Sequence, residues 1–299
     1  MERSTSASGE KSKAGRFLLV ATLTLLWGTN WPLFPLAVRE VSVWTFRAIC
    51  LLGSGLLLMA WCRWKGHDLR VPRRHWMTVV VAALIYLVIW NIGSTYAAVL
   101  IPTGQAAVLG FTMPLWAALG ARVFLGERLT GRSLVAIGLT AAGVLLLLFK
   151  GWRLYADAPV GFVFGLLAGA AWAAGTLVLR RHPVPVNTTV LTAWQLLIAG
   201  VPLGVLALVF GSGEWFLPSW QSIAVIGYIT VIPMAIGNVA WFTIVDRLPT
   251  SVATLSPILV PVVAMISGAI VRHEPLGLLE CTAMACSALG LFLGLRRKD

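Results

Sequence analysis

Residues 91–148 and 238–295 read as two copies of one segment, because Asn91 aligns with Asn238 at a shift of 147 residues. The other matches are Pro102-Thr103 with Pro249-Thr250, Ala106 with Ala253, Pro114 with Pro261, Glu127 with Glu274, Leu129 with Leu276 and Gly143 with Gly290. If each copy contains an odd number of membrane helices, the copies cross the membrane in opposite directions, as in the inverted repeats of secondary transporters. The duplication therefore favours a symmetric membrane fold.

Composition excludes a water-soluble fold, since 59% of the residues are hydrophobic and 11% are charged, against about 25% charged residues in soluble proteins. The apolar runs are continuous rather than alternating, and each is close to the roughly 20 residues that a helix needs to cross a bilayer. They lie at 16–37, 42–62, 75–97, 102–125, 131–150, 159–180, 187–210, 220–244, 250–272 and 276–296. We predict an all-α integral membrane protein with ten transmembrane helices in two inverted five-helix repeats, at 16–150 and 159–296.

The net charge of +12 is a signal of topology rather than of nucleic-acid binding. With the N-terminus inside, eighteen Lys and Arg residues fall on the cytoplasmic side. Four fall outside, namely Arg39, Lys150, Arg153 and Arg272. This orientation satisfies the positive-inside rule and the reverse one violates it. We expect both termini to be cytoplasmic and residues 1–15, which are rich in Ser and Lys, to be disordered.

Paired prolines interrupt the predicted helices. Pro114 lies in the fourth span and Pro261 at the equivalent position of the ninth. A proline inside a helix removes one hydrogen bond and kinks the chain. Prolines also serve only to fit membrane helices together, but the equivalence of these two favours symmetry-related hinges.

Four polar side chains fall at mid-depth: Asn30, Asn91, Gln195 and Asn238. One interpretation is that they bond neighbouring helices, which contributes about 0.6 kcal/mol each. The other is that they line a wet cavity, where an amide could bond a substrate. The two roles are compatible.

Aromatic residues support a cavity. Of fourteen tryptophans, seven lie near helix ends as an interfacial belt. The others lie deeper, beside Tyr86, and a buried Trp still needs a partner for its ring N–H. We predict that three or four of these eight residues line a central cavity. The leading candidates are Trp27, Tyr86, Trp116 and Trp172, with Trp90 as a further one.

Arg47 is the one clearly embedded charge, about one turn below the outer end of the second span. Snorkelling to the surface is the preferred interpretation, and attraction of a carboxylate from the cavity is the alternative. The sequence offers no catalytic constellation, metal-ligand spacing or cofactor motif. Glu127 and Glu274, which follow the fourth and ninth spans, are expected to cap helices or pair with Arg.

Three motifs carry a resemblance. They are Trp-Gly-Thr-Asn-Trp (27–31), Phe-Leu-Gly-Glu-Arg-Leu (124–129) and His-Glu-Pro-Leu (273–276). Together with the repeat, they resemble the drug/metabolite transporter superfamily over residues 16–296, and within it the EamA-type exporters. Trp-Asn-Ile-Gly (90–93) and Gly-Asn-Val-Ala (237–240) are similar to the YddG-like branch, which exports aromatic and other neutral amino acids.

The resemblance implies a substrate cavity between helices 1–4 and 6–9, with helices five and ten peripheral. We therefore expect a multi-pass exporter of the bacterial inner membrane that moves amino acids by alternating access as a monomer or weak dimer. Because no carboxylate or histidine lies at depth, we expect no proton coupling. Efflux of lipophilic cations is the alternative, since rings attract cations. A membrane-embedded enzyme is the alternative from a different class.

Overall fold

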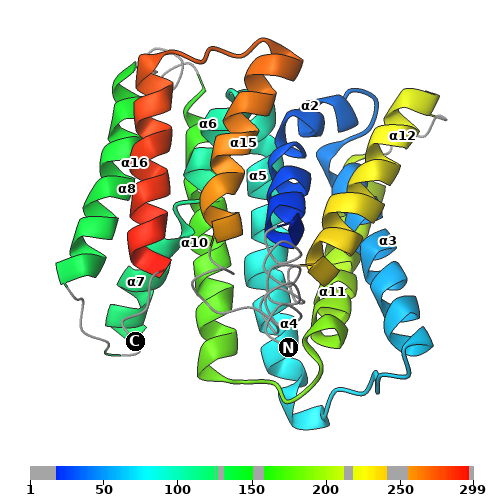
Figure 1. The fold of residues 1–299 in the computed structure, drawn as a ribbon. Coiled ribbons are helices and arrows are strands. Elements are labelled where there is room, and N and C mark those ends of the chain that lie inside the picture. Colours follow the sequence, from blue (N-terminus) through cyan, green and yellow to red (C-terminus); the bar gives the residue numbers. More distant parts are fainter. Residues whose placement is uncertain are drawn as a thin grey trace, which may run out of the picture.

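The computed structural model describes residues 18–124, 126, 131–150, 158–211, 218–240 and 255–295. In these residues the regular structure is helical, without strands (Figure 1). Six of the helices are long and apolar enough to cross a membrane, and shorter apolar helices cover Ile137–Leu147, Leu259–Arg272 and Leu278–Gly290. This architecture is that of an all-helical membrane protein.

The first membrane segment is a broken helix. A helix over 18–28 ends in a turn at Thr29 and Asn30, and η1 (Trp31–Leu33) and α2 (Phe34–Ala37) follow. Both short helices carry a proline in their first two positions. Proline has no N–H and a φ angle suited to a helix start, so each proline favours a new helical segment.

Local capping signals set where three longer helices begin. Ser42 precedes α3 (Val43–Trp64), and its hydroxyl accepts a hydrogen bond from the Thr45 N–H at 3.1 Å. Asn187 precedes α11 (Thr188–Phe210) and accepts from the Thr189 N–H at 2.9 Å. The helix α10 (Pro159–Arg181) starts with its proline. These residues satisfy or remove the unpaired N–H groups of the first turn.

Two membrane crossings contain a wider π-helical stretch. The first runs through η2 (Arg73–His75), α4 (Trp76–Ala82), the π-helix η3 (Ala83–Val88) and α5 (Ile89–Leu100). The second runs through α12 (Trp220–Ile229), the π-helix η5 (Thr230–Ile236) and helical residues 237–240. The two π-helices start at positions that the sequence shift of 147 makes equivalent. Such segments are rare and often lie at functional sites.

The remaining helices are α6 (Thr103–Gly110), α7 (Met113–Phe124), α8 (Gly131–Lys150), α15 (Leu255–Arg272) and α16 (Leu278–Leu295). Helices from the two halves pack in pairs: α3 against α11, α8 against α16, α5 against α10 and α6 against α15. Figure 1 shows α8 and α16 side by side at one edge of the bundle. A side chain at Gly143 of α8 would lie 2.9 Å from the Ala283 carbonyl of α16, so this close approach requires glycine.

Large apolar side chains cover the outer surface of the bundle. Leu56 on α3, Phe149 on α8 and Leu208 on α11 are all mainly exposed. Soluble monomers seldom expose apolar surface on this scale, whereas lipid solvates it. The exposed faces of these helices are therefore suited to contact with a bilayer.

Candidate substrate site

Three aromatic side chains from two membrane crossings form the centre of the candidate site. Tyr86 lies in η3 and Trp90 one turn later in α5. Trp172 of α10 contacts both, with ring centroids 5.2 Å from Tyr86 and 4.9 Å from Trp90. The contacts are edge-on, which brings the positive edge of one ring to the negative face of the next. The structure thus groups three of the predicted site residues.

The cluster continues toward the first membrane segment. The Trp31 ring lies 6.2 Å from Trp90, and Phe111 lies 6.1 Å from Trp90 and 6.3 Å from Trp31. A Cβ at Gly110 would lie 3.2 Å from Trp31 and 3.3 Å from Trp90, so the rings depend on glycine there. Neither Trp31 nor Phe111 is among the predicted site residues, although the Trp-Gly-Thr-Asn-Trp motif contains Trp31.

Gln195 of α11 adds a polar group to the aromatic cluster. Its Oε1 accepts a hydrogen bond from the Tyr86 hydroxyl at 2.8 Å, and the side chain is 1% exposed. Its Nε2 has no hydrogen-bond partner in the described part of the chain. A buried donor without a partner costs about 1–3 kcal/mol. The unpaired N–H₂ group is therefore available to a ligand acceptor.

Asn91 and Asn238 bond their own helices rather than neighbouring ones. The Asn91 Nδ2 donates to the Leu87 carbonyl at 2.8 Å, and the Asn238 Nδ2 donates to the Met234 carbonyl. Both carbonyls belong to π-helices, where the regular pattern of backbone hydrogen bonds is interrupted. Of the two interpretations of these residues, bonds to neighbouring helices do not hold for the amide donors, which instead stabilise the π segments.

The other predicted aromatic residues make their polar contacts outside the cluster. The Trp27 ring N–H donates to the Pro233 carbonyl in η5 at 3.0 Å, which ties the first helix to the second π segment. The Trp116 ring N–H donates to the Thr112 hydroxyl at 3.1 Å. Asn30 is buried, and its Oδ1 has no partner among the described residues. The structure thus gives Asn30, like Gln195, an unpaired polar atom.

Arg47 does not snorkel. Its side chain is 2% exposed, and its Nε donates to the Thr95 hydroxyl of α5 at 2.5 Å. The centre of the guanidinium lies 4.2 Å from the Phe34 ring and 4.7 Å from the Phe46 ring. Thr95 and Phe34 hold the side chain among the helices and away from the water interface. Sequence reasoning missed these two neighbours, since nothing local links them to Arg47.

The backbone differs around the two predicted hinge prolines. Helix α6 ends at Gly110, and Pro114 is the second residue of α7, so the fourth crossing is interrupted at Phe111 and Thr112. Helix α15 instead runs continuously through Pro261. Equivalent sequence positions therefore have unequal conformations in this structure.

The carboxylates of Glu274 and Glu280 cap helices. Glu274 accepts from the Thr103 N–H at 2.8 Å, the Thr103 hydroxyl at 2.9 Å and the Gly104 N–H at 3.2 Å, at the start of α6. Arg272 lies 3.5 Å from the same carboxylate. Glu280 accepts from the Gly277 N–H at 3.0 Å. The expected capping and Arg pairing are confirmed for Glu274, and Glu127 lies outside the described residues.

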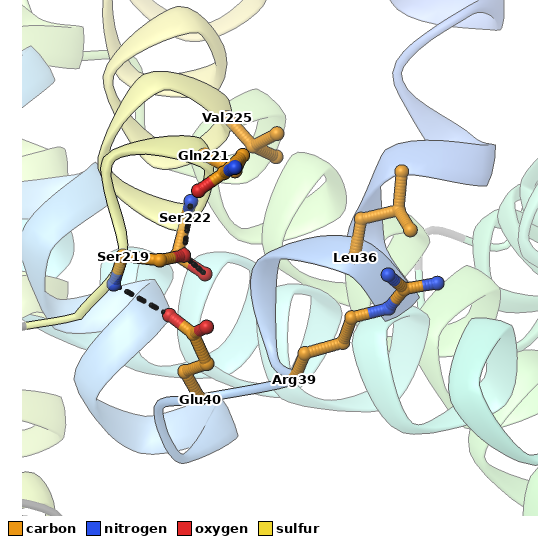
Figure 2. Close-up of a pocket in the computed structure, with 7 residues that line it drawn as sticks. All are labelled: Leu36, Arg39, Glu40, Ser219, Gln221, Ser222 and Val225. Atoms are coloured by element: carbon orange, nitrogen blue, oxygen red, sulfur yellow. Dashed lines mark hydrogen bonds between the residues drawn. The ribbon is translucent and has the colours of Figure 1, made fainter.

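A cavity of about 380 Å³ opens where the chain leaves α2 and enters α12. Figure 2 shows the Glu40 carboxylate bonded to the Ser219 N–H, at 2.7 Å, and Arg39 extending away from it toward Leu36. Hydrogen bonds lower the pKa of Glu40, and the bond from the Ser222 side chain has the largest effect. The bonds from the backbone and the side chain of Ser219 have smaller effects in the same direction. The carboxylate thus ties the loop after α2 to the start of α12.

Proteins of similar sequence are named as transporters. The uncharacterized transporter YvbV of Bacillus subtilis (strain 168) is 27% identical over 264 residues, which cover 87% of this chain and 85% of that protein. The uncharacterized inner membrane transporter YedA of Escherichia coli (strain K12) is 26% identical over 275 residues, which cover 91% of this chain and 87% of that protein. A protein of the same strain named "Probable amino-acid metabolite efflux pump" is 30% identical over 184 residues, which cover 58% of this chain and 61% of that protein.

A comparison with solved structures and a family match add to these sequence similarities. A solved crystal structure superposes with a TM-score of 0.68 at 19% identity and covers 94% of this chain and 97% of that chain. One family model matches the chain twice, over residues 16–149 and again over 159–296. The protein is a membrane transporter that belongs to the EamA-like transporter family.

Proposed function

We propose that this transporter exports aromatic and other neutral amino acids, as the YddG-like branch of its superfamily does. The observation that carries the proposal is the cluster of Tyr86, Trp90 and Trp172 with the unpaired amide of Gln195. Aromatic rings provide an apolar surface for a substrate side chain. A buried N–H₂ provides a donor for a carboxylate, and the unpaired Oδ1 of Asn30 provides an acceptor for an ammonium group. The efflux-pump name of one relative supports the same substrate class.

We further propose ten membrane helices in two inverted five-helix repeats. The family model matches each half separately, which supports a duplication. Two local features also recur at the shift of 147: the π-helices, and the asparagines that bond carbonyls within them. With five crossings in each half and the positive-inside rule, both termini are cytoplasmic. The relative YedA is named as an inner membrane transporter, which supports a location in the inner membrane.

We propose that transport proceeds by alternating access, which the unequal halves of the structure support. In an inverted repeat, the two halves exchange conformations as the site opens to one side and then to the other. The fourth crossing is interrupted before Pro114, whereas α15 is continuous through Pro261. This inequality supports Pro114 and Pro261 as the hinges at which each half bends.

Lipophilic cations are the second candidate substrate, because the rings of the cluster would attract them. The buried charge of Arg47 opposes this, since its guanidinium lies over Phe34 in the same continuous set of rings. A cation that entered this set of rings would meet like charge in a low dielectric. An anionic or zwitterionic substrate would not.

The decisive experiment is counterflow in proteoliposomes. Proteoliposomes that contain the purified protein and are loaded with unlabelled L-phenylalanine should take up radiolabelled L-phenylalanine. A panel of neutral amino acids should compete with this uptake, whereas cationic dyes should not. Protein-free liposomes serve as the control. Competition by the dyes without competition by amino acids would reverse the assignment.

Topology is tested by cysteine labelling from outside the cell. In a variant without the four native cysteines, a cysteine at Gln221 should react with a membrane-impermeant maleimide and a cysteine at Asp68 should not. Gln221 is the second residue of α12 and lines the cavity at the start of this helix, and Asp68 lies in the loop after α3. Labelling of both positions from one face would contradict the inverted repeat.

A further inference from the structure

Arg47 is a buried cation, and no anion pairs with it among the described residues. It lies one turn into α3, and its side chain is 2% exposed. The described carboxylates belong to Glu40, Asp68, Glu274 and Glu280, and no ion pair between any of them and Arg47 is found in the described structure. Moving a charged group out of water costs several kcal/mol unless a partner compensates.

The contacts of Arg47 compensate this cost in part. Thr95 occupies the Nε, and the rings of Phe34 and Phe46 lie against the guanidinium and attract it by cation–π interaction. The Nη2 has no hydrogen-bond partner among the described residues. A guanidinium matches a carboxylate better than any single hydroxyl or ring does, because two of its N–H groups can bond both oxygens.

The position of Arg47 separates it from the centre of the cluster. Thr95, whose hydroxyl bonds Arg47, follows Tyr86 by nine residues, or roughly 13 Å of helix, so Tyr86 and Thr95 lie at different depths of the same crossing. The rings between them are continuous: Phe34 lies 5.6 Å from Trp31, and Trp31 lies 6.2 Å from Trp90. Arg47 therefore stands at the end of the aromatic path that is nearer the start of α3.

We propose that Arg47 forms a carboxylate subsite in the outer third of the membrane, through which an amino acid passes after leaving the cluster at Tyr86. The inference rests on the proposed export of amino acids and adds the group that selects for the carboxylate. Thr95 is a positioning residue, because its hydroxyl holds the Nε while the Nη2 stays without a partner among the described residues. Phe34 of α2 covers the guanidinium, so binding of a carboxylate requires α2 to move, and the Thr29–Asn30 turn is the break in the chain before it.

The test compares two ligands that differ only in the carboxylate. Binding of L-phenylalanine and of L-phenylalaninamide is measured by ligand-induced thermal stabilisation in detergent, and counterflow of L-phenylalanine is measured in proteoliposomes. Arg47→Gln should weaken L-phenylalanine binding by at least about 30-fold, the minimum expected when one partner of a buried charge pair is lost, and should leave binding of the amide unchanged. Arg63→Gln, at the exposed end of the same helix, should behave as wild type.

Thr95→Val is the second variant and decides the question if Arg47→Gln does not fold. It keeps the side-chain shape and removes the hydroxyl, so L-phenylalanine binding should fall several-fold while amide binding stays constant. Unchanged selectivity in the folded variants, or equal losses for both ligands, would overturn the subsite while amino-acid counterflow by the wild type still stood. Absence of counterflow by folded wild-type protein with any amino acid would instead reject the proposed function.

Discussion

Asn91 and Asn238 make the same hydrogen bond in the two halves of the chain, each from its side-chain amide to the carbonyl four residues earlier, in a π-helix. A π-helical stretch breaks the regular ladder of backbone bonds, so a side-chain donor at this place stabilises a conformation that would otherwise revert to α-helix. The recurrence of both features links a sequence repeat to a repeated local structure.

Asn91→Leu and Asn238→Leu should therefore have matching effects. Each removes one hydrogen bond within its helix, which contributes about 0.5–1.5 kcal/mol. We expect the melting temperature in detergent to fall by about 1–4 °C in each variant, with slower counterflow. A loss confined to one of the two positions would contradict their equivalence.

Tyr86→Phe isolates the polar part of the candidate site. The change keeps the ring that contacts Trp172 and removes the hydroxyl that donates to Gln195. Counterflow of L-phenylalanine should fall about 5- to 10-fold, as expected when a net hydrogen bond of about 1 kcal/mol is lost. The melting temperature should fall by a few °C, because the buried Gln195 Oε1 loses its donor. Trp64→Ala, which changes an exposed aromatic at the end of α3, should transport normally. Normal transport by Tyr86→Phe would assign the hydroxyl to packing alone.

Pro114→Ala and Pro261→Ala should change the exchange rate more than the substrate affinity. Alanine restores an N–H in each helix and favours a straight segment, which biases one access state. Initial rates and half-saturation concentrations of counterflow separate the two effects. An altered affinity at an unchanged rate would make these prolines part of the binding site.

Glu40 should stabilise the protein over most of the pH range. Its pKa is lowered in the folded state, chiefly by the Ser222 hydrogen bond, so its contribution is complete above the unfolded value of about 4.3 and is lost as the pH falls through the lower folded value. The difference in melting temperature between wild type and Glu40→Gln should therefore stay constant from about pH 7 to about pH 5 and shrink below the ordinary glutamate pKa. A difference that disappears near neutral pH would mean that Ser219 and Ser222 do not hold the carboxylate.

Transport should proceed without a proton gradient. Glu274 and Glu280 accept bonds from backbone N–H groups at helix starts, so their charges have a structural role. Counterflow should be complete at equal pH on both sides, and an imposed pH difference should not concentrate substrate. Glu280→Gln should retain counterflow at reduced stability. Uphill accumulation that this variant abolishes would identify Glu280 as a proton carrier.

The sequence alone indicated which segments are long and apolar enough to cross a membrane. Long apolar runs are a local feature, and the runs predicted at 42–62, 159–180 and 187–210 correspond to α3, α10 and α11. The short motifs also indicated the family, which the family model supports. The model matches residues 16–149 and 159–296, nearly the same two segments that the repeat suggested. Tyr86, Trp90 and Trp172 were found because aromatic side chains at mid-depth are uncommon outside functional or packing clusters.

Only the tertiary structure decided which side each residue faces. Lipid is as apolar as a protein core, so hydrophobicity does not distinguish the outside of a membrane helix from its inside. For this reason the sequence could not show that Arg47 turns inward to Thr95 and Phe34, or that Trp27 bonds the Pro233 carbonyl of a distant crossing. The contrast between Pro114 and Pro261 was also not readable from the repeat: a proline stands at the equivalent position of each half, yet the chain is interrupted between α6 and α7 and continuous in α15.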